Sequence, residues 1–114
     1  MEKPFRHRLI AHEELLGTLL SLPSPEIAEL LAKSGFDWLF IDMEHSTIGL
    51  KDAQQMIQAA EPNAHSIIRV PGNDELWIKR CLDTGAEGII VPQVNSKKEA
   101  EQAVQYTKYH TKGK

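Results

Sequence analysis

The chain has 114 residues, of which 41% are hydrophobic and 25% are charged, proportions that are ordinary for a single domain over residues 1–114. The formal net charge of −3 argues against nonspecific binding to nucleic acid, so no nucleic-acid partner is expected. A single cysteine, and an N-terminal stretch too polar for a signal peptide or a membrane span, predict a cytoplasmic protein without a membrane partner.

An N-terminal helix and a first strand–helix pair are predicted at the start of the chain. The helix falls within residues 1–17, and its uneven apolar face is made by Leu9, Ile10, Leu15 and Leu16. GTLLSL at 17–22 is a short apolar strand, which the following Pro-Ser-Pro ends. Ser24 can cap a helix whose first residue is Pro25 and which stops near Gly35.

Three more strands alternate with helices along the rest of the chain. WLFI at 38–41 is a continuous apolar run typical of a strand covered on both faces, and apolar spacing predicts a helix over 50–60. SIIRVP at 66–71 is the third strand, and Asn73 or Asp74 can cap the next helix. That helix carries Cys81, for which a core position is favoured over a reactive thiol. GIIVPQV at 88–94 is the fourth strand, followed by a helix over 97–109 that Asn95 or Ser96 caps.

Strands that alternate with helices predict an α/β fold with parallel strand pairing. An open doubly wound sheet and a barrel both fit this pattern. A complete (β/α)₈ barrel needs about 200–250 residues, so four β/α units with an N-terminal helix would supply half of one.

In such folds the active site lies at the carboxyl ends of the strands. The polar residues expected there are Ser21, Asp42, Glu44, His45, Arg69, Gln93 and Asn95. Arg69 ends an apolar strand, where it can pair with Asp42 or Glu44 or can clamp a carboxylate or an enolate. His45 can act as a general base or can be an exposed turn histidine.

Other signals are weak or missing from the sequence. The available carboxylates to orient His45 are Asp42, Glu44 and Asp83, whereas His7, His12, His65 and His110 have no such context. The sequence contains no nucleotide-binding glycine motif and no spacing typical of a zinc site. Asp42 and Glu44 alone would be a thin site for a hard divalent cation.

Three blocks in this order, GFDWLFIDMEH, RVPGND and GAEGIIVPQV, resemble the HpcH/HpaI aldolase family over residues 17–109. These are class II, metal-dependent pyruvate aldolases, of the 4-hydroxy-2-oxoheptanedioate and 2-keto-3-deoxy sugar acid type. The resemblance implies the N-terminal half of a TIM barrel. Two departures are Leu19, where many relatives carry an aromatic residue, and the final YHTKGK.

The resemblance also implies roles for individual residues. His45 would be the general acid/base, Asp83 its carboxylate partner, and Arg69 the group that binds pyruvate and stabilises its enolate. Asp42 and Glu44 would support the metal and water network. The family's Mg²⁺ or Mn²⁺ ligands, a Glu and an Asp, would lie beyond Lys114, so no metal ligand is expected within this chain.

The favoured function is cleavage of 2-keto-4-hydroxy acids to pyruvate and an aldehyde, with weak or no activity expected of the 114 residues alone. The alternative is a truncated or split, non-catalytic half-barrel that acts only as an assembly subunit. Either reading predicts a homo-oligomer or a complementary half-barrel as partner. A standalone α/β binding module, with the segment 5–16 covering the sheet, is a third reading.

Overall fold

Four parallel strands in the order β1-β2-β3-β4 form one sheet in the computed structural model, which describes residues 3–112 and the side chains of residues 3–107. The strands are β1 (Gly17–Leu20), β2 (Trp38–Asp42), β3 (His65–Arg69) and β4 (Gly88–Ile90). The predicted parallel pairing is confirmed for every neighbouring pair. His110, which the sequence left without a role, lies outside the described side chains.

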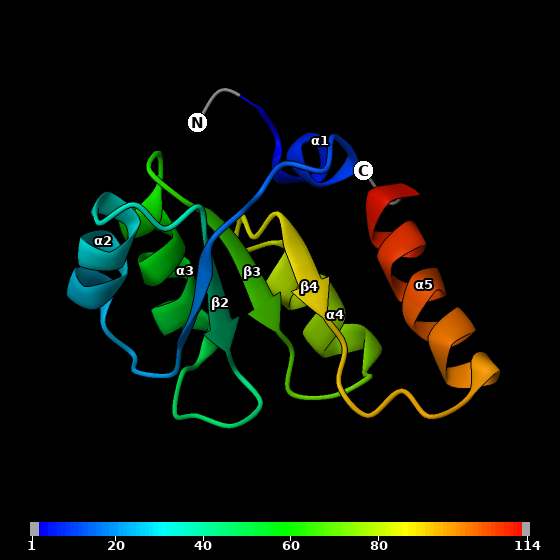
Figure 1. The fold of residues 1–114 in the computed structure, drawn as a ribbon. Coiled ribbons are helices and arrows are strands. Elements are labelled where there is room, and N and C mark those ends of the chain that lie inside the picture. The colour runs from blue at the N-terminus through cyan, green and yellow to red at the C-terminus, as the bar shows by residue number, and fades with distance from the viewer. Residues whose placement is uncertain (1–2, 113–114) are drawn as a thin grey trace.

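One helix precedes the first strand, and one follows each of the four strands. They are α1 (Phe5–Ile10), α2 (Pro25–Lys33), α3 (Leu50–Ala60), α4 (Glu75–Leu82) and α5 (Lys97–Lys112). Helices α2, α3 and α4 pack on the same face of the sheet, each against the strand that follows it, and α5 packs on α4. Figure 1 shows α1 at the edge where the strands begin, so the long loops at their carboxyl ends lie on the opposite edge.

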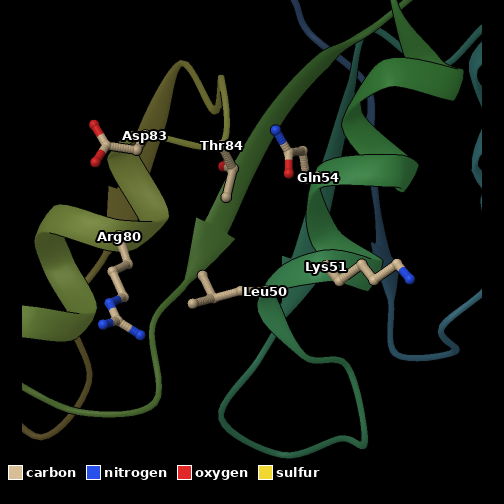
Figure 2. Close-up of a pocket in the computed structure, with 6 residues that line it drawn as sticks. All are labelled: Leu50, Lys51, Gln54, Arg80, Asp83 and Thr84. Carbon is tan, nitrogen blue, oxygen red and sulfur yellow. The ribbon is translucent and has the colours of Figure 1, made fainter.

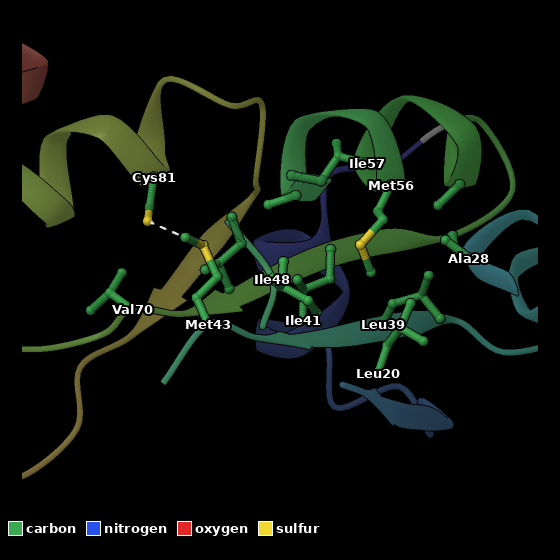
Figure 3. Close-up of a cluster of buried hydrophobic side chains, with 14 of the residues drawn as sticks. Leu20, Ala28, Leu39, Ile41, Met43, Ile48, Met56, Ile57, Val70 and Cys81 are labelled. Carbon is green, nitrogen blue, oxygen red and sulfur yellow. Dashed lines mark hydrogen bonds between the residues drawn. The ribbon is translucent and has the colours of Figure 1, made fainter. Parts of the chain in front are cut away.

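The core lies between the sheet and its helices (Figure 3). Alternate strand residues point to this side, so Leu39, Ile41 and Ile68 are fully buried against Met56 and other helix residues. The intervening residues point to the opposite face, which α2, α3 and α4 leave uncovered and which α1 touches near the strand starts, through Phe5 beside Trp38. There Leu19 remains 57% exposed.

Local signals in the sequence explain how the helices start. The Ser24 hydroxyl accepts a hydrogen bond from the Ile27 amide at 3.1 Å, as the capping pattern predicts. Of the two candidates before α4, Asp74 is the cap, because its carboxylate accepts from the Leu76 amide at 3.2 Å. Before α5, the Ser96 hydroxyl accepts from the Glu99 amide at 3.1 Å.

Several elements differ from their predicted bounds, among them β3, which spans 65–69 rather than 66–71, and the following three. Helix α1 covers only six residues and buries Phe5, whereas Leu9, Ile10 and Leu16 are more than half exposed. Strand β1 ends two residues early, at Leu20. Strand β4 ends at Ile90 rather than residue 94, because Pro92 has no amide to donate and Gln93 has a left-handed backbone with φ of 55°.

Candidate functional site at the strand ends

Asp42 and Arg69 form the centre of a polar cluster where β2 and β3 end. They are register partners in the sheet, so their side chains leave the same face side by side. Nε of Arg69 donates to Oδ1 of Asp42 at 3.1 Å, and Nη2 donates to Oδ2 at 2.6 Å. This two-bond pairing lowers the pKa of Asp42 from 3.8 to about 2 and raises that of Arg69.

Asp42 also shapes the turn that follows β2. Its Oδ1 accepts hydrogen bonds from the amides of Glu44 at 2.9 Å and His45 at 3.1 Å. Its carbonyl oxygen accepts from the Ser46 hydroxyl. One almost fully buried carboxylate therefore ends the strand, sets the turn and holds the guanidinium.

Glu44 joins the remaining members of the cluster. Its Oε1 lies 3.4 Å from Nε of Arg69 and 3.2 Å from Nε2 of His45, and its side chain is only 9% exposed. Its Oε2 accepts from Nε2 of Gln93 at 3.3 Å. Asp42, Glu44, His45, Arg69 and Gln93 together are called the strand-end cluster below.

His45 presents its imidazole to solvent at the edge of the cluster. Its side chain is 68% exposed, while Nε2 remains within reach of the Glu44 carboxylate. His45 is thus an exposed turn residue with a carboxylate beside it, and its role as a general base stays a prediction. A molecule bound at the strand ends would meet the imidazole without displacing any core side chain.

Arg69 links the strand-end cluster to a hollow on the uncovered face of the sheet. Its guanidinium carbon lies 5.2 Å from the centre of the Phe40 ring, a stacking distance. A cavity of about 320 Å³ is lined by Gly17, Thr18, Leu19, Trp38, Phe40 and Arg69. Among the described residues, Nη1 of Arg69 has no hydrogen-bond partner, so one edge of the guanidinium can receive an anion.

Asp83, the predicted partner of His45, lies in another part of the molecule. It ends α4, and helices in this fold run opposite to the strands, so the end of α4 points toward the edge where the strands begin. Figure 2 shows it beside a pocket of about 380 Å³ between α3 and α4. That pocket is lined by Leu50, Lys51, Gln54, Arg80, Asp83 and Thr84. The structure does not bring Asp83 to His45 within one chain, and its role stays a prediction.

Two of the other residues predicted at the strand ends are exposed, and two aromatic residues beside the site were not predicted. Ser21 and Asn95, expected at the same edge, are exposed, and the amide of Asn95 donates to Glu99 at 3.0 Å. Trp38 and Phe40 were not among the candidates, although both lie an even number of positions before Asp42 and therefore share its face.

The described residues do not form a metal site. No group of three or more His, Cys, Asp or Glu side chains among residues 3–107 could hold an ion. Both oxygens of Asp42 accept from Arg69, and both oxygens of Glu44 contact neighbouring side chains. A divalent cation would need ligands from outside these residues. The same part of the chain contains no helix long and apolar enough to span a membrane.

Comparison with known proteins places these features in a family. The family model described as HpcH/HpaI aldolase/citrate lyase matches residues 16–114. The chain is 39% identical over 113 residues to a hydroxypyruvate/pyruvate aldolase of Paraburkholderia phytofirmans, covering 96% of this chain and 44% of that protein. It is also 39% identical over 114 residues to a 4-hydroxy-2-oxo-heptane-1,7-dioate aldolase of Escherichia coli, covering 99% and 44%.

A solved HpcH/HpaI aldolase/citrate lyase family protein from Burkholderia cenocepacia superimposes with a TM-score of 0.83 and 37% identity. The match covers 90% of this chain and 41% of that one. Such structural neighbours have the TIM-barrel fold, which confirms the predicted fold class. The chain spans less than half the length of the relatives that it matches.

Proposed function

The chain belongs to the HpcH/HpaI aldolase/citrate lyase family, and on that premise we propose that its strand-end cluster is the 2-keto-acid side of an aldolase site. The observation that carries the proposal is the position of Arg69. Its guanidinium is held by Asp42, stacks on Phe40 and borders the cavity on the uncovered face. A planar cation in that position suits the carboxylate and keto oxygens of pyruvate.

The proposed reaction is cleavage of a 2-keto-4-hydroxy acid. The 4-hydroxyl loses its proton and becomes the carbonyl of an aldehyde, while the C3–C4 bond breaks and its electron pair forms the enolate of pyruvate. A proton added at C3 then completes pyruvate. Arg69 would stabilise the negative charge that develops on the enolate oxygen.

His45 is the group proposed to move the proton. It is the exposed titratable side chain of the strand-end cluster, and Glu44 lies 3.2 Å from its Nε2. Glu44 would orient the imidazole during the transfer. Asp42 would act through Arg69, by fixing the direction of the guanidinium.

A divalent ion such as Mg²⁺ or Mn²⁺ would stabilise the enolate in a class II aldolase. The described residues do not supply a ligand set for one, so no step of the reaction is assigned to it here. We therefore expect the 114 residues alone to release pyruvate slowly or not at all, even with Mn²⁺ added. If the isolated chain released pyruvate at a substantial rate, and His45→Ala abolished that release, this expectation would be wrong.

Binding tests the proposal directly. Oxalate is a planar anion that resembles the enolate of pyruvate, and it should shift the NMR signals of the Arg69 and Phe40 side chains. Arg69→Lys keeps the positive charge but loses the planar guanidinium with its paired N–H donors. It should therefore weaken oxalate binding at least about tenfold. Arg80→Lys, in the pocket between α3 and α4, is the matched control and should bind normally. Equal binding by both variants would refute a role for Arg69.

A non-catalytic assembly role is the second candidate, favoured by the shape of the sheet. Within the described residues β1 and β4 each pair on one side only, and Leu19 and its neighbours on the uncovered face are partly exposed. Association with another copy or with a complementary half-barrel would cover this face. Light scattering across a concentration series tests it, and a monomer at every concentration would argue against it.

A further inference from the structure

A second polar cluster lies at the opposite edge of the sheet, where the strands begin. It consists of Arg8 from α1, Asp37 just before β2, His65 at the start of β3 and Glu87 just before β4. His65 is 1% exposed, which makes it one of the few buried polar side chains described in the chain. These four residues are called the base cluster, and they are separate from the strand-end cluster.

The base cluster fastens α1 to the sheet through several direct contacts. Nη1 of Arg8 lies 3.1 Å from Nε2 of His65, and its Nη2 donates to Asp37 at 3.0 Å. The backbone amide of Phe5 donates to Oε2 of Glu87 at 2.9 Å. Apolar support is small, because Phe5 is the buried residue of this six-residue helix and rests on the His65 ring at 5.0 Å between centroids.

The contacts define the protonation state of His65 in the docked structure. A guanidinium has donors and no acceptor, so Nε2 of His65 must be the unprotonated nitrogen that accepts from Arg8. Nδ1 then carries the proton and donates to Oε1 of Glu87 at 2.6 Å. The ring facing Arg8 is therefore the neutral imidazole.

Protonation would convert this acceptor into a donor that faces Arg8. The ring would keep its bond to Glu87 but would lose the one to α1, and two cationic groups would stand 3.1 Å apart in a buried place. The charged groups around the ring are Arg8, Asp37 and Glu87, and Glu13 contacts the far side of Arg8 at 3.0 Å. Those carboxylates supply counter-charge for an imidazolium. Of the two hydrogen bonds of the ring, protonation therefore removes the one to Arg8 and keeps the one to Glu87.

We propose that the base cluster is a pH-responsive latch, in which protonation of His65 releases α1 from the edge of the sheet. The change is confined to α1 because the sheet bonds of His65 and its neighbours do not involve its ring. Release would uncover the ring of His65 and the adjoining face of Trp38, which Phe5 contacts at 5.9 Å. The proposal is independent of the aldolase function.

Hydrogen exchange followed by NMR tests the latch in the full chain. The amide of Phe5 reports docking directly, because it bonds to Glu87, and the amide of Ile68 in β3 reports the sheet. Between pH 8 and pH 5, after correction for intrinsic rates, protection of Phe5 should fall about tenfold, because protonation of His65 removes a contact that holds α1. Protection of Ile68 should not change.

Two variants make the result specific. His65→Gln can still accept from Arg8 and donate to Glu87 but cannot take up a proton, so Phe5 should stay protected at both pH values. His7 and His12 remain in that variant and control for other histidines near α1. Arg8→Met should leave Phe5 unprotected at both pH values while Ile68 stays protected, and it tests the latch if His65→Gln does not fold. Phe5 protection that is independent of pH in the original chain, or equally dependent in His65→Gln, would refute the proposal.

Discussion

Asp42 and Arg69 end neighbouring strands in register, and their two hydrogen bonds join the carboxyl ends of β2 and β3. The pair satisfies a carboxylate that is almost fully removed from water and leaves the guanidinium partly exposed beside the cavity. Its charge state therefore affects both the stability of the sheet edge and any anion that binds there.

Acid should weaken the fold through Asp42. Its pKa is lowered to about 2 in the folded chain, from 3.8, so the stabilisation is present above pH 4 and is lost as the pH falls from about 4 to about 2. The shift corresponds to about 2 kcal/mol in the free energy of unfolding. Urea unfolding at a series of pH values should show this loss, and Asp42→Asn should remove most of it. Glu29→Gln, an exposed carboxylate, should leave the pH dependence unchanged, and a loss of the same size in Asp42→Asn would contradict the assignment.

Gly17 is required by the ring that lies against it. A methyl group added there would overlap the indole of Trp38, its register partner in β2. Gly17→Ala should therefore cost about 1–3 kcal/mol in unfolding free energy, because the ring or the strand must move. Gly72→Ala is the control, since an added methyl group there meets no atom within 4 Å. Equal stabilities of the two variants, measured by thermal or urea unfolding, would show that Trp38 can move aside freely.

Leu39 carries a large share of the core between the sheet and the helices. It is fully buried, so Leu39→Ala should leave a cavity and lower the free energy of unfolding by about 2–5 kcal/mol. Leu30 on α2 is 64% exposed, and Leu30→Ala should change stability by less than about 0.5 kcal/mol. Chemical denaturation measures the free energy of unfolding of both variants. Equal values for Leu39→Ala and Leu30→Ala would mean that β2 is not packed as described.

The thiol of Cys81 should be unreactive in the folded chain. It is fully buried beside Met43, with 3.8 Å between the sulfur atoms, and burial raises its pKa to about 11. Ellman's reagent at pH 8 should therefore label it only as the chain unfolds, so the labelling rate should rise with urea along the unfolding curve. Rapid labelling without urea would mean that α4 opens far more often than its packing indicates.

Much of the fold follows from local patterns that the sequence displays openly. The apolar runs at 38–41 and 66–71, the cap at Ser24 and the turn residues between elements predict strand, helix and order without any long-range information. The ends of β4 and α1 were harder to predict. Gln93 adopts a left-handed backbone that no sequence rule requires of glutamine, and α1 depends on contacts to residues far along the chain.

Part of the candidate site was predictable, because strand order and register alone bring some of its residues together. Asp42 and Arg69 follow parallel strands, and their pairing was one of the two readings of the sequence. The base cluster was not predictable in this way, because Arg8, Asp37, His65 and Glu87 come from four segments and none forms a motif with another. Asp83 shows the opposite case, because its place at the end of a helix already sets it toward the other edge of the sheet.

The two tryptophans, Trp38 and Trp77, are fluorescent reporters of different events, because Trp38 contacts Phe5 of α1. Trp38 lies on the uncovered face between Phe5 and Phe40, whereas Trp77 on α4 packs against the core. Indole fluorescence depends on local polarity, so undocking of α1 should shift emission from Trp38 alone, and global unfolding should shift emission from both. Single-tryptophan forms of the chain would then separate motion at one edge of the sheet from loss of the whole fold.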